Sequence, residues 1–325
     1  MSQNFSSKRN IISFLSIAAM LILLVYISSN PYVSKQETLR IGITEWPGFE
    51  YLFIAKKQGF FKKAGLNIEL VELSSLAEVR RAFERGKVDG MAATLVEVLE
   101  AYKYSGQIAQ PIAVIDYSNG ADEILGNKNL KNINDLKGKK IGVEAGSMSA
   151  YLVSRALEIN NIDYSDVIII PMSLLKLPKA LKTGKVDAIT SYPPVSIAIK
   201  KQIEINVLFD SSLIPRKLID VIAINKNVLK HNPKLRQSFL QAWGETLRYA
   251  EENPESSYQT LTERLHISIQ EFKNSMSLIN LVGIDEQDQY FNQDIIKDNL
   301  VKTGDIVFKH LDTSKVDYSE FIYAN

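Results

Sequence analysis

The 325-residue sequence contains no cysteine. This absence excludes a disulfide framework, thiolate zinc sites, iron–sulfur clusters held by cysteine, thiol catalysis and a lipidated cysteine anchor. Histidine is scarce too, because only His231, His266 and His310 occur, far apart in the last third of the chain. A histidine-rich metal centre or a Ser-His-Asp triad would have to be built from these three. We therefore expect neither a metal site nor a catalytic site.

An excess of positive charge is also missing. The chain has 38 Lys and Arg residues against 37 Asp and Glu residues, which gives a net charge of +1. This balance argues against a general DNA or RNA binder. The sequence has no Walker A, G-x-G-x-x-G, H-E-x-x-H or G-x-S-x-G motif, so no cofactor is expected. The 46% of hydrophobic residues and 23% of charged residues are typical of a globular protein.

The N-terminus carries an export signal or an anchor. Lys8 and Arg9 precede an uncharged apolar run from Ile11 to about Ser28. This run of about 18 residues lies between a secretory h-region of about 7–15 residues and a spanning helix of about 20. Residues 1–37 are therefore expected to be a cleaved signal peptide or an uncleaved helix that contacts the membrane. Both alternatives place the rest of the chain in the periplasm or another extracytoplasmic space, tethered to the cytoplasmic membrane if the helix is not cut.

From residue 38 on, short apolar runs alternate with helical patterns, which is typical of parallel α/β units. A strand at 219–224 is expected to return to the first half, followed by a long helix at 234–251 and further helices that pack there. The other expected strands are 39–44, 67–72, 88–92, 112–117, 140–144, 167–171, 186–190 and 206–209, and the other helices are 50–58, 76–85, 95–104, 149–159, 177–182 and 195–202.

The first half of this body repeats in the second. The segment 40–43 (RIGI) matches 140–143 (KIGV), and 82–89 (AFERGKVD) matches 180–187 (ALKTGKVD). A repeat of about 100 residues predicts two lobes of similar build, since a solenoid would repeat every 20–50 residues. We expect lobe 1 to comprise 38–120 and 216–325, and lobe 2 to comprise 121–215.

Candidate binding residues follow the strands of both lobes. Ligands of open α/β sheets bind outside the carboxyl ends of the strands, so these exits are expected to face one crevice. Two lobes around a crevice form a hinged clamp. The candidates are Trp46, Gly48, Glu50, Thr94, Asn119, Asp122, Glu144, Ser147, Tyr192 and Asp220.

Each candidate also has a purely structural interpretation. Trp46 forms an aromatic wall beside a ligand or fills the core of its own lobe. Asn119 and Asp122 contact a polar ligand or belong to a simple turn. Ser147 caps a helix whose free amides suit an anion, or it is an ordinary cap. Asp220 reaches the crevice or is a buried charge paired locally.

Several short motifs occur in a characteristic order along the chain. They are WPGFE at 46–50, KKQGFFKKAGLNIE at 56–69, ERGKVDG at 84–90, SNGAD at 118–122, DLKGKKIGVEAG at 135–146, TGKVDA at 183–188 and DSSLIP at 210–215. With these motifs the chain from about 38 to 255 resembles the substrate-binding proteins of nitrate/sulfonate/taurine-type ABC importers, relatives of the thiamine-pyrimidine-precursor binding proteins. The resemblance implies an α/β type II periplasmic-binding-protein fold, with two Rossmann-like lobes, a hinge and an interlobe cleft. It implies a monomer that closes on a small solute and delivers it to a membrane permease.

The solute class does not follow from the resemblance. The crevice candidates are rich in carboxylates and aromatic rings, which suit an amine-bearing or heteroaromatic solute better than nitrate or taurine. Two other functions stay open: an enzyme on the same fold, such as a menaquinone-pathway lyase, and a membrane-tethered ligand sensor. The lack of cysteine disfavours the fungal pyrimidine synthases among the relatives, whose motif is cysteine-rich. The acidic residues concerned are Glu45, Glu50, Asp122, Glu144 and Asp220.

Overall fold

The computed structural model describes residues 37–292, 294–309 and 316–323. The predicted signal peptide or anchor lies outside these residues, apart from Glu37. Within the described ranges, no helix is long and apolar enough to cross a membrane.

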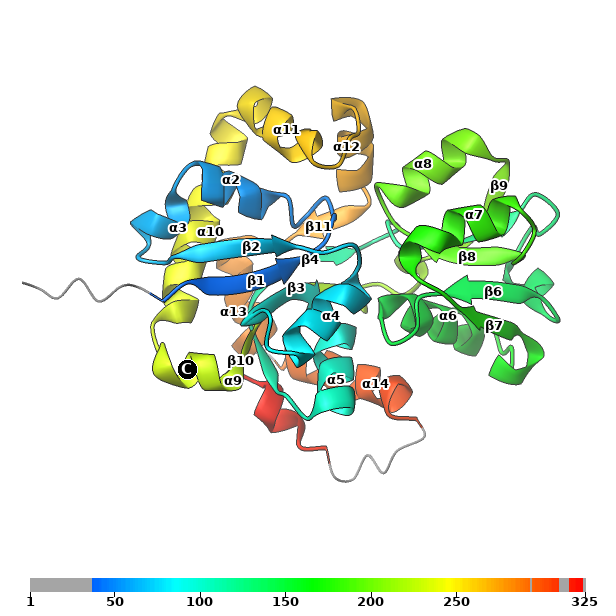
Figure 1. The fold of residues 1–325 in the computed structure, drawn as a ribbon, viewed down its shortest axis with the longest axis horizontal. Helices are drawn as coiled ribbons and strands as arrows, with labels where there is room; N and C mark the ends of the chain where they lie inside the picture. The colour runs from blue at the N-terminus through cyan, green and yellow to red at the C-terminus, as the bar shows by residue number, and fades with distance from the viewer. Residues whose placement is uncertain (1–36, 293, 310–315, 324–325) are drawn as a thin grey trace, which may run out of the picture. The chain divides into compact units, whose positions relative to one another are not determined.

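The first sheet has six strands in the order β11-β4-β10-β3-β1-β2 (Figure 1). Strand β1 pairs in parallel with β2 and β3, whereas β10 lies antiparallel between β3 and β4. The short strand β11 extends the sheet beside β4. The bounds are β1 Leu39–Ile43, β2 Ile68–Glu72, β3 Gly90–Thr94, β4 Ala109–Ser118, β10 Ile219–Asn225 and β11 Ile279–Leu281.

The second sheet has five strands in the order β7-β6-β8-β5-β9. Strand β6 pairs in parallel with β7 and β8, and β5 lies antiparallel between β8 and β9. The bounds are β5 Glu123–Asn127, β6 Lys140–Val143, β7 Ile168–Pro171, β8 Ala188–Ser191 and β9 Ile205–Asp210. We call the first sheet with its helices lobe 1 and the second sheet with its helices lobe 2.

The two sheets share one topology. The order β2-β1-β3-β10-β4 in the first sheet corresponds to β7-β6-β8-β5-β9 in the second. In each sheet the fourth position is taken by a strand, β10 or β5, that enters from the other half of the chain. The expectation of parallel units is correct for the strands within each half. Strands β5, β10 and β11 run in the opposite direction. Strands β5 and β10 each follow a segment in which the chain crosses from one lobe to the other, and β11 pairs antiparallel with β4.

The sequence repeat produces the same local structure in both lobes. In lobe 1 the Asp89 carboxylate accepts a hydrogen bond from the Arg40 amide at 2.9 Å, and the Asp89 amide donates to the Arg40 carbonyl at 2.7 Å. In lobe 2 the Asp187 carboxylate accepts from the Lys140 amide at 2.9 Å, and the Asp187 amide donates to the Lys140 carbonyl at 2.8 Å. The Gly-Lys-Val-Asp motif therefore fixes the start of the third strand against the first strand in each lobe.

Helices cover both faces of each sheet (Figure 1). Those of lobe 2 are α6 Met148–Ile159, α7 Leu177–Lys182 and α8 Val195–Gln202. Those in the rest of the described chain are α2 Tyr51–Lys57, α3 Phe60–Lys63, α4 Leu76–Glu84, α5 Leu95–Ser105, α9 Lys226–His231, α10 Leu235–Glu252, α11 Pro254–Glu263, α12 Ile269–Met276, α13 Ile284–Asn292 and α14 Ile295–Val307.

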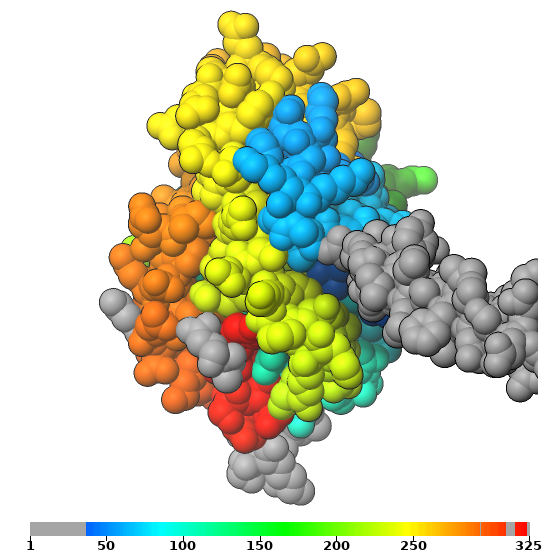
Figure 2. Space-filling model, turned by 90° about the vertical axis from the view of Figure 1, so that its left-hand side faces the viewer, coloured from blue at the N-terminus to red at the C-terminus, as the bar shows by residue number. Residues whose placement is uncertain are grey.

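The long helix α10 packs on the first helices of the chain. Phe239 stacks on Phe61 with ring centroids 6.0 Å apart, and Trp243 meets Tyr51 edge-on at 6.2 Å. Figure 2 shows the resulting face, with the yellow C-terminal helices directly beside the blue N-terminal ones. The lobe boundaries at 120 and 215 remain our proposal: the first sheet is interrupted between Ser118 and Ile219.

Gly86 and Gly184 end matching helices with φ angles of 64° and 70°, in the left-handed region. A side chain there meets no neighbouring atom, so its cost comes from the backbone alone. We predict that Gly86→Ala and Gly184→Ala each lower the free energy of unfolding by about 1 kcal/mol, measured by urea denaturation. Gly283→Ala is the matched control, because Gly283 has no positive φ and open surroundings. Equal effects at all three positions would contradict the prediction.

Candidate functional site

A small cavity collects side chains from both lobes. Its volume is about 10 Å³, about enough for one water molecule and far below the roughly 300–1,000 Å³ typical of sites for drug-sized ligands. Every lining residue is more than nine-tenths buried, and no Lys or Arg is among the described residues that line it. The lining residues are Thr44, Trp46, Phe49, Leu76, Thr94, Asp122, Met148, Tyr192 and Asp220.

Half of the predicted binding residues meet at this cavity: Trp46, Thr94, Asp122, Tyr192 and Asp220. They come from the ends of strands β1, β3 and β8, from the crossing after β4, and from β10. The carboxyl-end rule for α/β sheets applies to Trp46, Thr94 and Tyr192. Asp220 lies at the start of β10, which runs antiparallel to β3 and therefore begins beside Thr94. The residues that meet here are up to 174 positions apart in the chain.

Trp46 forms part of the cavity wall and is fixed from two sides. Its indole Nε1 donates to both carboxylate oxygens of Asp116, at 3.2 and 3.1 Å. Its ring meets the Tyr192 ring edge-on, with centroids 5.9 Å apart. Gly48 belongs to this arrangement because a Cβ atom there would overlap the Asp116 carboxylate. Trp46 thus joins a residue of lobe 2 to a carboxylate of lobe 1.

Asp116 is a site residue that the sequence reasoning missed. It lies near the end of β4, within the apolar run 112–117, and is completely buried. A charged residue inside an otherwise apolar strand was the available signal, because a buried carboxylate needs a specific partner.

Asp116 and Asp220 stand directly opposite each other on the neighbouring strands β4 and β10. Their side chains interact with each other. Burial raises the pKa of both carboxyl groups, and the charge of Asp116 raises that of Asp220 further. Two buried carboxyl groups in contact are stable when one carries a proton that it donates to the other.

Two more carboxyl groups near the cavity are shifted in the same direction. Burial raises the pKa of Asp122 to about 7, against a hydrogen bond from Ser118 that lowers it. Burial also raises the pKa of Glu97 to about 7, although Thr94 and Met148 donate hydrogen bonds to it. The region around the cavity is therefore strongly acidic.

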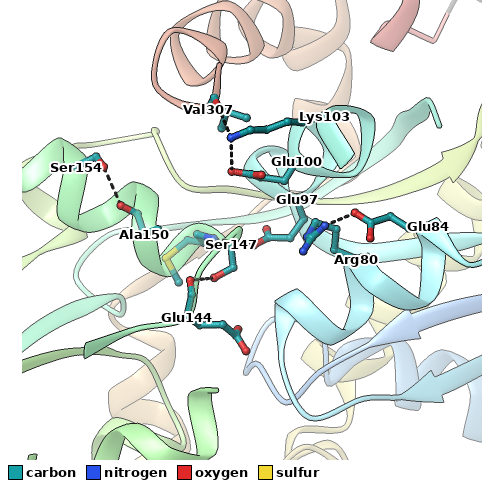
Figure 3. A network of polar contacts seen from close by, with 11 residues as sticks. Arg80, Glu84, Glu97, Glu100, Lys103, Glu144, Ser147, Ala150, Ser154 and Val307 are labelled. Carbon is teal, nitrogen blue, oxygen red and sulfur yellow. Dashed lines mark hydrogen bonds and ion pairs between the residues drawn. The ribbon is translucent and has the colours of Figure 1, made fainter. Parts of the chain in front are cut away.

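Glu97 connects the two lobes. It lies on α5 of lobe 1 and accepts a hydrogen bond from the Met148 amide at the start of α6 in lobe 2, at 2.7 Å. Its other oxygen accepts from the Thr94 amide and hydroxyl at 3.1 and 2.6 Å, which completes a capping box on α5. Figure 3 shows Glu97 pointing from α5 toward the Ser147 turn. One carboxylate thus occupies the positive ends of two helices.

Glu144 makes the reciprocal connection. It follows β6 in lobe 2 and accepts a hydrogen bond from the Ser75 hydroxyl at 2.7 Å and from the Ala77 amide at 3.4 Å. Both donors lie at the start of α4 in lobe 1. We call Glu97 and Glu144 the interlobe carboxylates. At each of these helix N-termini a protein carboxylate stands where an anionic solute would otherwise be stabilised.

The remaining predicted residues lie off the cavity lining. Ser147 caps α6, accepting from the Ser149 amide and donating to the Glu144 carbonyl at 2.9 Å (Figure 3). Asn119 is exposed on the crossing segment. The Glu50 carboxylate accepts a hydrogen bond from Arg264 Nε at 2.9 Å. Because Arg264 directly follows α11, this bond ties C-terminal residues to lobe 1.

The chain crosses between the lobes after β4 and again after β9. Serine side chains join these two crossing segments. The Ser118 and Ser211 hydroxyls are 2.7 Å apart, and Ser211 also accepts from the Gly120 amide at 2.7 Å. The Ser211 amide donates to the Asp122 carbonyl at 2.9 Å. These bonds hold Asp122 at the base of the cavity. Within the described ranges, no group of three or more His, Cys, Asp or Glu residues is arranged to hold a metal ion.

Comparison with known proteins identifies the family. The family model described as NMT1/THI5 like matches residues 46–257, which include most of the cavity lining. The chain belongs to the NMT1/THI5-like family. Among relatives in sequence is a Haemophilus influenzae protein named for thiamine biosynthesis, 24% identical over 217 residues that cover 66% of this chain and 68% of the relative. The Saccharomyces cerevisiae 4-amino-5-hydroxymethyl-2-methylpyrimidine phosphate synthase THI13 is 22% identical and covers 64% and 65%.

Solved structures of other proteins have the same fold. The periplasmic aliphatic sulphonate binding protein SsuA of Escherichia coli has a TM-score of 0.69 and 20% identity, covering 89% of this chain and 92% of SsuA. The Candida albicans CA3427 gene product, which has the generic periplasmic binding protein fold, has a TM-score of 0.70 and 15% identity, covering 88% and 96%. The predicted resemblance to importer substrate-binding proteins and the predicted fold are confirmed.

The bonds made by Glu97 generate a prediction about stability. Glu97→Ala leaves the buried Thr94 and Met148 amides without an acceptor, so the free energy of unfolding should fall by about 2–4 kcal/mol. Glu97→Gln keeps the volume and one acceptor oxygen and should lose clearly less. Chemical denaturation of both variants measures the difference. An alanine variant as stable as the native protein would contradict the assigned role.

The raised pKa of Asp220 generates a prediction about pH. An unfolded aspartate loses its proton near pH 4, whereas folded Asp220 keeps it to higher pH. The folded state therefore binds more protons, and its stability falls as pH rises above about 4. Asp220→Asn removes this effect, so its stability relative to the native protein should rise by about 1–3 kcal/mol between pH 5 and pH 8.

Denaturation curves at several pH values test this, with the exposed Asp288→Asn as control. A stability difference between Asp220→Asn and the native protein that is the same at pH 5 and pH 8 would refute the assigned shift.

Proposed function

We propose that this protein is the extracytoplasmic solute-binding component of an ABC importer. It clamps a small amine-bearing or heteroaromatic solute between its lobes and delivers it to a membrane permease. The family match and the periplasmic-binding fold support the importer role. The resemblance found in the sequence supports the permease as partner.

One observation carries the choice of solute: the helix N-termini facing the cleft are already occupied by carboxylates of the protein. Glu97 lies at the starts of α5 and α6, and Glu144 at the start of α4. An anion such as nitrate or a sulfonate would have to enter beside these charges and beside Asp122 and Asp220, with no Lys or Arg among the described lining residues. A cation gains from the same charges.

The aromatic residues supply the second part of the site. Trp46, Tyr192 and Phe49 line the cavity with the carboxylates. An aromatic face attracts a cation and also stacks on a heteroaromatic ring. A flat, protonated ring or an aryl amine therefore uses both features of the wall.

Closure follows from the same contacts. Trp46 of lobe 1 touches Tyr192 of lobe 2, and the interlobe carboxylates bind amides or hydroxyls across the cleft. A solute that contacts both Trp46 and Tyr192 from the cavity adds to these contacts and favours the closed state. The permease then has one closed, loaded form to recognise.

Catalysis is the second candidate, because the yeast relative THI13 is named as a synthase. We propose binding instead, since the residues at the cavity include no cysteine or histidine among those described and the buried carboxylates have structural partners. Release of a new product from an aminopyrimidine by the purified protein would favour the enzyme. A membrane-tethered sensor would bind solute equally well but would not change its uptake in cells.

The two tryptophans provide a matched test of solute binding. The full chain should gain about 2.7 kcal/mol of stability, or several degrees in Tm, at 100 times the dissociation constant of its solute. We predict this shift with benzamidine or a 4-aminopyrimidine and its absence with taurine and nitrate. Trp46→Phe should weaken binding at least tenfold, because it removes the N–H that orients Asp116.

Trp243→Phe is the control, since its indole donates to the Val282 carbonyl away from the cavity, and it should leave the affinity unchanged. A shift with taurine or nitrate alone would contradict the proposed solute class.

A further inference from the structure

The burial of the Asp116–Asp220 pair is not offset by a Lys or Arg among the described groups that act on it. The two residues face each other across β4 and β10 with both side chains at least 96% buried. Asp116 accepts both of its described hydrogen bonds from Trp46 Nε1. Asp220 lines the cavity, and Asp116 contacts Trp46, which lines it as well.

The groups that act on the Asp116–Asp220 pair come from four other parts of the fold. Those that can carry a charge are carboxyl groups or a tyrosine hydroxyl. Asp122 after β4 and Glu97 of α5 act on Asp220, and Asp116 acts on Tyr290 of α13. Trp46 of the loop after β1 is the neutral donor. None of the described groups that act on the pair is a Lys or an Arg. A charge on both aspartates at once would therefore be strongly unfavourable.

A second observation points into the same cavity. The Tyr192 hydroxyl is buried and lines the cavity, near the Thr44 side chain. It makes no hydrogen bond of normal geometry with the described residues. A buried hydroxyl in this state is ready to accept a hydrogen bond from a solute N–H.

We propose that Asp116 and Asp220 share one proton in the solute-free protein and that the cationic group of the solute replaces this proton. This inference rests on the proposed function. In this step the O–H bond of the carboxylic acid breaks and the proton leaves to solvent. The solute N–H groups then donate to the carboxylate oxygens of Asp220. The net charge of the pair with its occupant stays the same, so the buried site pays no additional electrostatic cost.

The exchange makes solute affinity depend on pH in a defined way. A probe with a permanent charge competes with the proton, so its affinity rises about tenfold per pH unit until the pair has lost its proton in the free protein. A neutral molecule of the same shape has no such dependence. Benzamidinium and benzamide are such a pair.

Calorimetric titration of the full chain with benzamidinium between pH 5.5 and 8.5 tests the proposal. We expect affinity to rise with pH and about one proton to be released per bound molecule, detected as a dependence of the heat on the buffer. Asp220→Asn should abolish proton release and flatten the pH profile. Asp288→Asn, an exposed control, should behave like the native protein.

The free protein gives a readout that needs no solute. The infrared difference between the native protein and Asp220→Asn at pH 7 should contain the carbonyl band of one protonated carboxyl group. Absence of this band would overturn the shared proton, whatever binds.

The remaining outcomes separate the two proposals. Benzamidinium binding with a flat pH profile would overturn the proton exchange and leave the proposed function intact. Failure to bind benzamidinium at any pH overturns the exchange, and binding of taurine or nitrate by the same sample would overturn the proposed solute as well.

Discussion

Asp116, Asp122 and Asp220 are buried around one cavity, and no Lys or Arg among the described lining residues offsets their charge. Burying a carboxylate without a partner is expensive, so such groups retain protons, accept hydrogen bonds or bind cations. The neighbouring contacts follow from this constraint. Trp46 donates to Asp116, and the crossing segments supply Ser118 to Asp122. The solute class and the proton exchange are two consequences of the same unbalanced charge.

The sequence predicted the fold well where local chemistry decides it. The Gly-Lys-Val-Asp repeat contains a helix end and an aspartate that binds the preceding strand, so it implied two similar lobes before any geometry was known. Strand β5 was missed because it follows the polar turn 118–122 and has no helix before it. Strand β11 was missed because three residues are too few for a periodic pattern. The antiparallel direction of β10 depends on where the chain re-enters the sheet, which local patterns do not contain.

The site was predictable in part for a different reason. Strand exits indicate which residues come near the crevice, and this rule found Trp46, Thr94 and Tyr192, whereas Asp220 was predicted from the returning strand. It does not indicate which side chain points inward. Glu50 and Glu144 both follow a first strand, but the first binds Arg264 and the second binds α4. Asp116 lies inside a strand rather than at its exit, so the exit rule does not find it, and its signal in the sequence is a charge within an apolar run.

The central claim is that the acidic cavity holds the cationic group of a solute, and a crystal structure of the protein with benzamidinium or an aminopyrimidine tests it most directly. The ring of the solute should lie against Trp46 and Tyr192, with a charged nitrogen within hydrogen-bond distance of the Asp220 carboxylate. A solute bound elsewhere, or a sulfonate or nitrate held in the cavity by backbone amides, would contradict it.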